Sequence, residues 1–160
     1  MASMFFSEQW AGAVRDVLEA GPDEEALAGK LQEYWDFYNL VRFTYPSSWA
    51  LAARGLPAEL GGGTRYLVVG WTEGNVSECR VLDESEPVDA TYVLAADYHD
   101  WKALFEGYDA LRTVMYRKLL LEDGDLLEFF KGIYFFVECL ALIATVSTTL
   151  PANSAVLTAV

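Results

Sequence analysis

The sequence predicts an α+β fold, in which short strands and helices alternate along 160 residues. Three observations predict this class. Residues 66–82 form two strand-like segments around a Thr-Glu-Gly-Asn turn, which is typical of a β-hairpin. Residues 91–95 form a further strand that leads directly into a helix capped by Asp97. The longest apolar run, residues 126–146, predicts one long C-terminal helix.

The long helix has a clear start. Asp125 stands at the N-cap position and Glu128 follows three residues later, which is the pattern of a capping box. Sixteen of the twenty-one residues that follow Asp125 are apolar, so the helix is apolar on most of its circumference. Such a helix must be covered by several elements, by a partner chain or by an apolar ligand.

Two features argue against a membrane span. Glu138 interrupts the apolar run, and Pro151 ends the uncharged stretch after twelve residues, whereas a spanning helix needs roughly 17–25 residues. The N-terminus, residues 1–6, has neither the basic region nor the long apolar core of a secretory signal. We therefore expect a soluble, cytoplasmic protein.

Length and charge limit the classes of partner. We expect a single domain, residues 1–160, that is large enough to bury a real core. The 24 acidic and 11 basic residues give a net charge of −13, which repels phosphate backbones, so nucleic acid is not an expected partner. Contact with anionic membranes should be transient at most. Cys79 and Cys139 lack metal-binding spacing and are expected to be free thiols.

Local signals predict the N-terminal elements in order. Ser7 caps a first helix that Gly21 and Pro22 end. The remaining elements before the hairpin are a second helix from Asp23 through Leu27, Leu31, Tyr34, Trp35 and Tyr38, a short strand 41–45 ended by Pro46, an ambiguous segment 47–53, and a loop 57–63.

The elements after the hairpin follow from caps and turns. They are an acidic loop 83–87, the strand 91–95, a helix from Asp97 to Gly107, a helix capped by Asp109, and a strand 118–122 before the turn at Gly124. The tail after Pro151 has no clear period and could be loose or lie over a groove.

The sequence offers little catalytic chemistry. Because His99 is the single histidine, any nucleophile with an imidazole base must use it. It falls in the first turn of a predicted helix, where the helix dipole disfavours its protonation. The Gly61–Gly63 run lacks the lysine of a phosphate-binding loop, and we interpret it as a flexible turn. Neighbouring carboxylates such as Asp83 and Glu84 are typical of a solvated surface. We predict no catalytic residue, no metal site and no cofactor.

The order of elements over residues 64–150 resembles the sterol carrier protein 2 family. The residues that carry the resemblance are Ala90–Leu94, the helix from Asp97 through Trp101 and Leu104 to Gly107, and Lys118–Leu121 ahead of Gly124 and Asp125. The chain differs from the family pattern in two places. Arg117 precedes the lysine where the family usually has glycine, and one additional residue separates Lys118 from Gly124.

This resemblance implies a five-stranded mixed, mainly antiparallel sheet covered by helices. It also implies an apolar tunnel between the sheet and the C-terminal helices that holds fatty acyl chains, sterols or similar lipids, and it implies no catalytic residues. Residues 1–60 lie mostly outside the match. They are expected to be an N-terminal helical extension with a first strand, acting as a lid or a dimerisation element.

The leading functional hypothesis is non-enzymatic binding or transfer of an apolar ligand, namely a fatty acid, an acyl chain or a sterol-like lipid. Aromatic and large aliphatic side chains are the candidates for the lining of its site, although each could equally be ordinary core. They are Trp71, Trp101, Phe105, Met115, Phe129, Tyr134, Phe136 and Leu140. The alternatives are a homodimeric interaction module without a ligand and, with weaker support, an accessory hydrolase that uses His99.

One stripe of the long helix should face water and yet contains two large apolar residues. At about 100° per residue it comprises Glu128, Lys131, Phe135, Glu138, Leu142 and Thr145. A second copy of the chain could cover this stripe in a two-fold interface. The N-terminal helices, with Trp10, Trp35 and Tyr38, could equally cover it.

Overall fold

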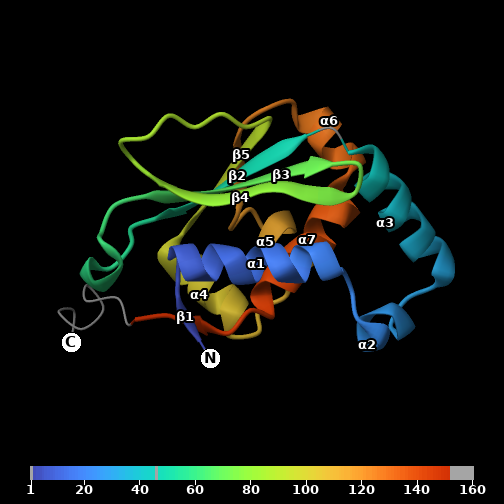
Figure 1. Cartoon of the computed structure of the whole chain (residues 1–160), viewed down its shortest axis with the longest axis horizontal. Coiled ribbons are helices and arrows are strands. Elements are labelled where there is room, and N and C mark those ends of the chain that lie inside the picture. The colour runs from blue at the N-terminus through green and yellow to red at the C-terminus, as the bar shows by residue number, and fades with distance from the viewer. Residues whose placement is uncertain (1, 46, 152–160) are drawn as a thin grey trace.

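Five strands form the main sheet in the order β4-β3-β2-β5-β6 (Figure 1). The computed structural model describes residues 2–45 and 47–151, so Pro46 and the tail after Pro151 lie outside the described residues. The strands of the sheet are β2 Ser48–Arg54, β3 Arg65–Thr72, β4 Asn75–Asp83, β5 Tyr92–Asp97 and β6 Leu120–Asp123. Three of the four pairings are antiparallel, and β2 with β5 is parallel. The predicted α+β class with a mixed, mainly antiparallel sheet is confirmed.

The central strand, β2, is the segment whose sequence was ambiguous. It pairs with β3 on one side and with β5 on the other, and its five inner residues, 49–53, are all buried. A strand that is covered on both faces loses the alternation of apolar and polar residues by which strands are recognised. The run Trp-Ala-Leu-Ala-Ala therefore carries no periodic signal, although it forms the middle of the sheet.

The helices cover one face of this sheet. They are α1 Glu8–Ala20, α2 Glu24–Ala28, α3 Gln32–Thr44, α4 Tyr98–Phe105, α5 Ala110–Met115, α6 Leu126–Lys131 and α7 Ile133–Ala144. In Figure 1, α1, α4, α5 and α7 lie below the sheet, and the loop of residues 84–91 arches above it. Under that loop, Val88 and Ala90 pack on Ala50, Val68 and Leu82 of the opposite face.

The two ends of the described chain meet in a small sheet, in which β1 Ser3–Met4 runs parallel to β7 Thr148–Thr149. This pairing directs Phe5 and Phe6 into the core, where both rings contact Trp10. Ser7 then caps α1 as predicted, because its hydroxyl accepts a hydrogen bond from the Trp10 backbone N–H at 3.1 Å. The N-terminal helices therefore share the main core, and the division of the chain into 1–60 and 64–150 stays a prediction.

Two predictions for residues 23–45 are wrong. The second helix is divided into α2 and α3 by Gly29 and the two residues after it, and the predicted strand 41–45 is the end of α3. Val41 and Tyr45 lie four residues apart on one helix face, against Gly132. Arg42 is buried, and its guanidinium donates hydrogen bonds to the carbonyls of Gly74 at 2.8 Å and Glu19 at 2.9 Å. These long-range contacts outweigh the local alternation of apolar and polar residues.

The predicted single C-terminal helix is divided at Gly132 into α6 and α7. Asp125 caps α6 as predicted, since its carboxylate accepts from the N–H groups of Leu127 and Glu128 at 3.0 and 3.1 Å. The Glu128 side chain instead bonds to Lys131 at 2.7 Å. Glycine weakens the helix at residue 132, and its missing side chain lets α3 approach closely, because an added Cβ would lie 3.2 Å from the Tyr45 ring.

Both departures from the sterol carrier protein 2 pattern have a local explanation. Arg117 adopts φ = 61°, the left-handed conformation that glycine enters most readily. Val93 pairs with Asp123 whereas Leu94 pairs with Leu121, so a β-bulge leaves one additional residue, Glu122, on β6. The register of β6 against β5 therefore shifts by one residue at that bulge.

The stripe of the long helix that was expected to be wet is covered within the chain. Phe135 is fully buried against Tyr38 and Tyr45, while the Glu138 carboxylate accepts bonds from Lys30 and from the Tyr34 hydroxyl, both at 2.6 Å. The stripe could have been covered by a second copy of the chain or by the N-terminal helices, and the contacts of Phe135 and Glu138 are with the N-terminal helices. Formation of a homodimer through another surface stays a prediction. In the part of the chain that the structure describes, every helix is too short or too polar to cross a membrane.

Substitution of Phe135 by alanine should lower the free energy of unfolding by about 3–5 kcal/mol, because it leaves a cavity in the centre of the core. Phe37→Ala is the matched control, since that ring is 44% exposed on α3 and its loss should cost under about 1 kcal/mol. Urea unfolding of both variants measures the difference. An equal decrease in the free energy of unfolding in both variants would contradict the central role of Phe135.

Substitution of Gly124 by alanine should also be destabilising, by about 2 kcal/mol or more. Gly124 has φ = 113°, and an added Cβ would lie 2.6 Å from the Tyr92 ring and 2.8 Å from the Thr91 carbonyl oxygen. Gly12→Ala is the opposite case, because no atom lies within 4 Å of its added Cβ on α1. That change should stabilise the protein by about 0.5–1 kcal/mol in thermal unfolding. If Gly124→Ala left the stability unchanged, the turn would have to move to accommodate the added Cβ, and the prediction would be wrong.

Candidate functional site

An apolar hollow of about 510 Å³ lies where α5, β6 and α6 meet beside β5. It is lined by nine apolar side chains and one cationic one. The lining residues are Leu94, Val114, Met115, Arg117, Leu119, Leu120, Leu121, Leu126, Phe129 and Phe130. This set defines the apolar hollow below, and its composition is typical of a site for a hydrophobic ligand.

The apolar hollow has a closed floor and an open rim. Leu94, Leu119 and Phe129 are buried and form the floor. Four side chains at the rim are 40–54% exposed, and they are Met115, Leu120, Leu126 and Phe130. The rim therefore leaves large apolar side chains in water around an opening that leads to a dry interior.

Short, capped elements hold these walls in place. Asp109 caps α5 by accepting from the Arg112 N–H at 2.9 Å, and Asp125 caps α6 on the opposite side. The strand between them, β6, is at the edge of the sheet, and its one partner among the described strands is β5. Its leucines therefore lie beside the gap between the two helices instead of under another strand.

The structure distributes the predicted lining residues over three environments. Met115 and Phe129 lie in the apolar hollow. Trp71, Trp101, Phe136 and Leu140 are buried in the core between the sheet and the helices, and the Trp101 indole donates to the Ala52 carbonyl at 3.0 Å. Phe105 is half-buried against Phe5, and Tyr134 is 46% exposed beside Tyr34. Ligand contact by these eight residues stays a prediction.

Aromatic rings fill the space between the sheet and α7. Trp49 contacts Trp71, Phe135 and Phe136 with ring centroids 5.0–5.9 Å apart. The larger part of the lining of the apolar hollow was missed from the sequence, namely Leu94, Val114, Arg117, Leu119–Leu121, Leu126 and Phe130. One feature of the sequence could have indicated these residues, namely that α6 is apolar on more sides than one sheet can cover.

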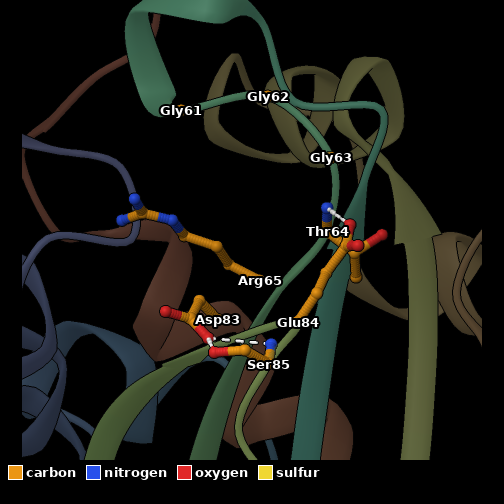
Figure 2. Close-up of a pocket in the computed structure, with 8 residues that line it drawn as sticks. All are labelled: Gly61, Gly62, Gly63, Thr64, Arg65, Asp83, Glu84 and Ser85. Atoms are coloured by element: carbon orange, nitrogen blue, oxygen red, sulfur yellow. Dashed lines mark hydrogen bonds between the residues drawn. The ribbon is translucent and has the colours of Figure 1, made fainter.

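A second, polar hollow of about 410 Å³ lies between the glycine-rich loop, residues 61–64, and the acidic turn after β4. Figure 2 shows that the Glu84 carboxylate accepts a hydrogen bond from the Thr64 backbone N–H. The Arg65 side chain turns away and donates to the Phe6 carbonyl at 3.3 Å. The Thr64 N–H, which follows the glycine run, is thus bonded to a carboxylate of the protein itself.

The other reactive groups of the described chain are a cluster at the start of α4 and two thiols. The side chains of Asp97, His99 and Asp100 offer ligand atoms within 4.8 Å of one another, so they could approach a cation at the surface. The Lys118 ammonium lies 3.8 Å from the Asp100 carboxylate and competes for it.

Burial raises the pKa of the Cys79 thiol to about 12 and that of Cys139 well above its ordinary value, so both free thiols stay protonated.

Comparison with known proteins gives a result at the level of structure alone. No protein-family model and no curated protein sequence matches this chain. The crystal structure of sterol carrier protein 2 superposes with a TM-score of 0.66 and 22% sequence identity, over 89% of this chain and 98% of that one. The solution structure of a conserved hypothetical protein from Thermus thermophilus, described as possibly a sterol carrier protein, gives 0.66 and 21%, over 96% of both chains. The chain therefore has the sterol carrier protein 2 fold.

Proposed function

We propose that this protein binds or transfers a lipid without catalysing a reaction, and that the apolar part of the lipid occupies the apolar hollow. The observation that carries the proposal is the combination of a buried apolar floor with a rim of exposed apolar side chains. Its volume of about 510 Å³ lies within the roughly 300–1,000 Å³ of ordinary ligand sites.

The physical driving force is the transfer of apolar surface out of water. Each Å² of apolar surface that a ligand and the rim bury together contributes about 25 cal/mol. Leu111, Tyr116 and Leu127 belong to the same elements and their connections and are also exposed. A chain-like ligand can insert its tail and keep a polar head in water.

The fold supports the same class of ligand. The two structural neighbours are described as a sterol carrier protein and a candidate sterol carrier protein. The chemistry of the site agrees, because its single charged residue among the described lining is Arg117 and it lacks a nucleophile paired with a base. A fatty acid, an acyl chain or a sterol-like lipid are the ligands that we propose to test.

Freshly purified protein should release a long-chain fatty acid or comparable lipid on organic extraction, and delipidated protein should bind a fluorescent fatty acid saturably. The double variant Met115→Glu with Leu126→Glu places two charges on the rim and should weaken this binding at least about tenfold. Phe37→Glu with Leu40→Glu makes the same change on the exposed face of α3 and should leave binding unchanged.

Empty extracts together with unsaturable titrations would contradict the proposal. Equal losses in both double variants would place the binding elsewhere. Native mass spectrometry of the same samples separates the alternative of a ligand-free homodimer, because it reports both the bound lipid and the number of chains.

Substitution of His99 by alanine should leave lipid binding and thermal stability unchanged, because the ring is exposed at the start of α4 and its polar contact is Asp100 at 3.4 Å. Titration of the fluorescent fatty acid and a melting curve test this. Loss of a measured hydrolytic activity on that single change would instead support the accessory hydrolase.

A further inference from the structure

One of the segments that wall the apolar hollow is unusually basic for this chain. Residues 110–121, which include α5 and the start of β6, contain Arg112, Arg117 and Lys118 and no acidic residue. The whole chain has 24 acidic residues against 11 basic ones. A positive segment in so acidic a protein attracts anions to one place.

Arg117 occupies a backbone position that disfavours it. Tyr116 is the C-cap of α5, and Arg117 follows in the left-handed conformation at φ = 61°, with its N–H bonded to the Val114 carbonyl at 3.1 Å. Helices commonly end in this way with glycine, since a side chain there is strained. A strained arginine persists where its side chain has a use.

The other non-glycine residues with positive φ in the described chain have structural explanations. Phe6 is buried among the aromatic rings of the core, and Glu73 belongs to the two-residue hairpin turn with Gly74. Arg117 is exposed, so packing does not explain it.

The guanidinium of Arg117 is available for a ligand. Among the described residues no carboxylate lies within 4 Å of it, whereas the neighbouring Lys118 is paired with Asp100 at 3.8 Å and lies 5.3 Å from the Tyr108 ring centroid. Arg117 is also the charged residue among the described lining of the apolar hollow. An unpaired cation therefore stands beside an opening that is otherwise apolar.

We propose that Arg117 is a specificity-determining residue that binds the anionic head of an amphiphile whose alkyl chain fills the apolar hollow. A guanidinium can donate two parallel hydrogen bonds to a carboxylate or a phosphate, which a neutral hydroxyl cannot match. This inference rests on the proposed function and adds that the site prefers anionic lipids to neutral ones.

The test compares three probes of equal alkyl chain length, namely a fatty acid, an alkyl phosphate and a fatty alcohol. Each competes with a fluorescent lipid on the delipidated full chain. The native protein should bind an anionic probe about fivefold more tightly than the alcohol, and that preference should decrease at high salt. The two anionic arms show whether a carboxylate or a phosphate is the better head group.

Three variants assign this preference to one side chain. Arg117→Gly suits the left-handed backbone, so it should melt at or above the native temperature, and it should lose the anionic preference, so that the three probes bind with equal affinity. Arg117→Lys should keep part of the preference, because it retains the charge without the planar fork. Lys118→Gln removes the adjacent charge and should keep the preference in full.

The outcomes separate this inference from the proposed function. An equal affinity of the native protein for all three probes, or an anionic preference that survives in Arg117→Gly, would overturn the role of Arg117 while lipid binding stands. Failure of every probe to bind would overturn the proposed function and this inference with it.

Discussion

The packing of Phe135 between the sheet and α3 is the contact on which the rest of the structure depends. Its ring meets Tyr38 and Tyr45 from α3 and its C-cap, Trp49 from the central strand and Trp71 from β3, at centroid distances of 5.0–5.8 Å. One side chain of α7 thus joins both layers and the N-terminal helices. These rings occupy the space between the sheet and α7, whereas the apolar hollow lies beside β6.

The break at Gly132 gives the two parts of the C-terminal helical segment different tasks. In α7, Phe135 and Phe136 are buried in the core, whereas α6 supplies Leu126 and Phe130 to the rim of the apolar hollow. Gly132 also lets α3 lie close to the junction.

Charge and apolarity are arranged together at this opening. The protein is strongly acidic, yet residues 110–121, which form one wall of the apolar hollow, carry only positive charges, whereas the segment 122–128 that follows carries four acidic residues. The acidic turn after β4 is occupied by contacts within the protein, such as that of Glu84 with Thr64. The opening beside β6 is the place that we propose for the apolar tail and the anionic head of a ligand.

The sequence by itself determined the elements whose signals are local. Ser7, Asp109 and Asp125 cap helices through hydrogen bonds to N–H groups two or three residues away, and Glu73 with Gly74 forms the hairpin turn. Tertiary structure alone decided the identity of β2, which is buried on both faces and so has no alternation. It also decided which apolar residues form the site. Phe130 and Phe136 belong to one apolar run, yet the first is 42% exposed at the rim and the second 1% exposed in the core. Burial depends on contacts with distant segments, such as α3 and the sheet, that the local sequence does not specify.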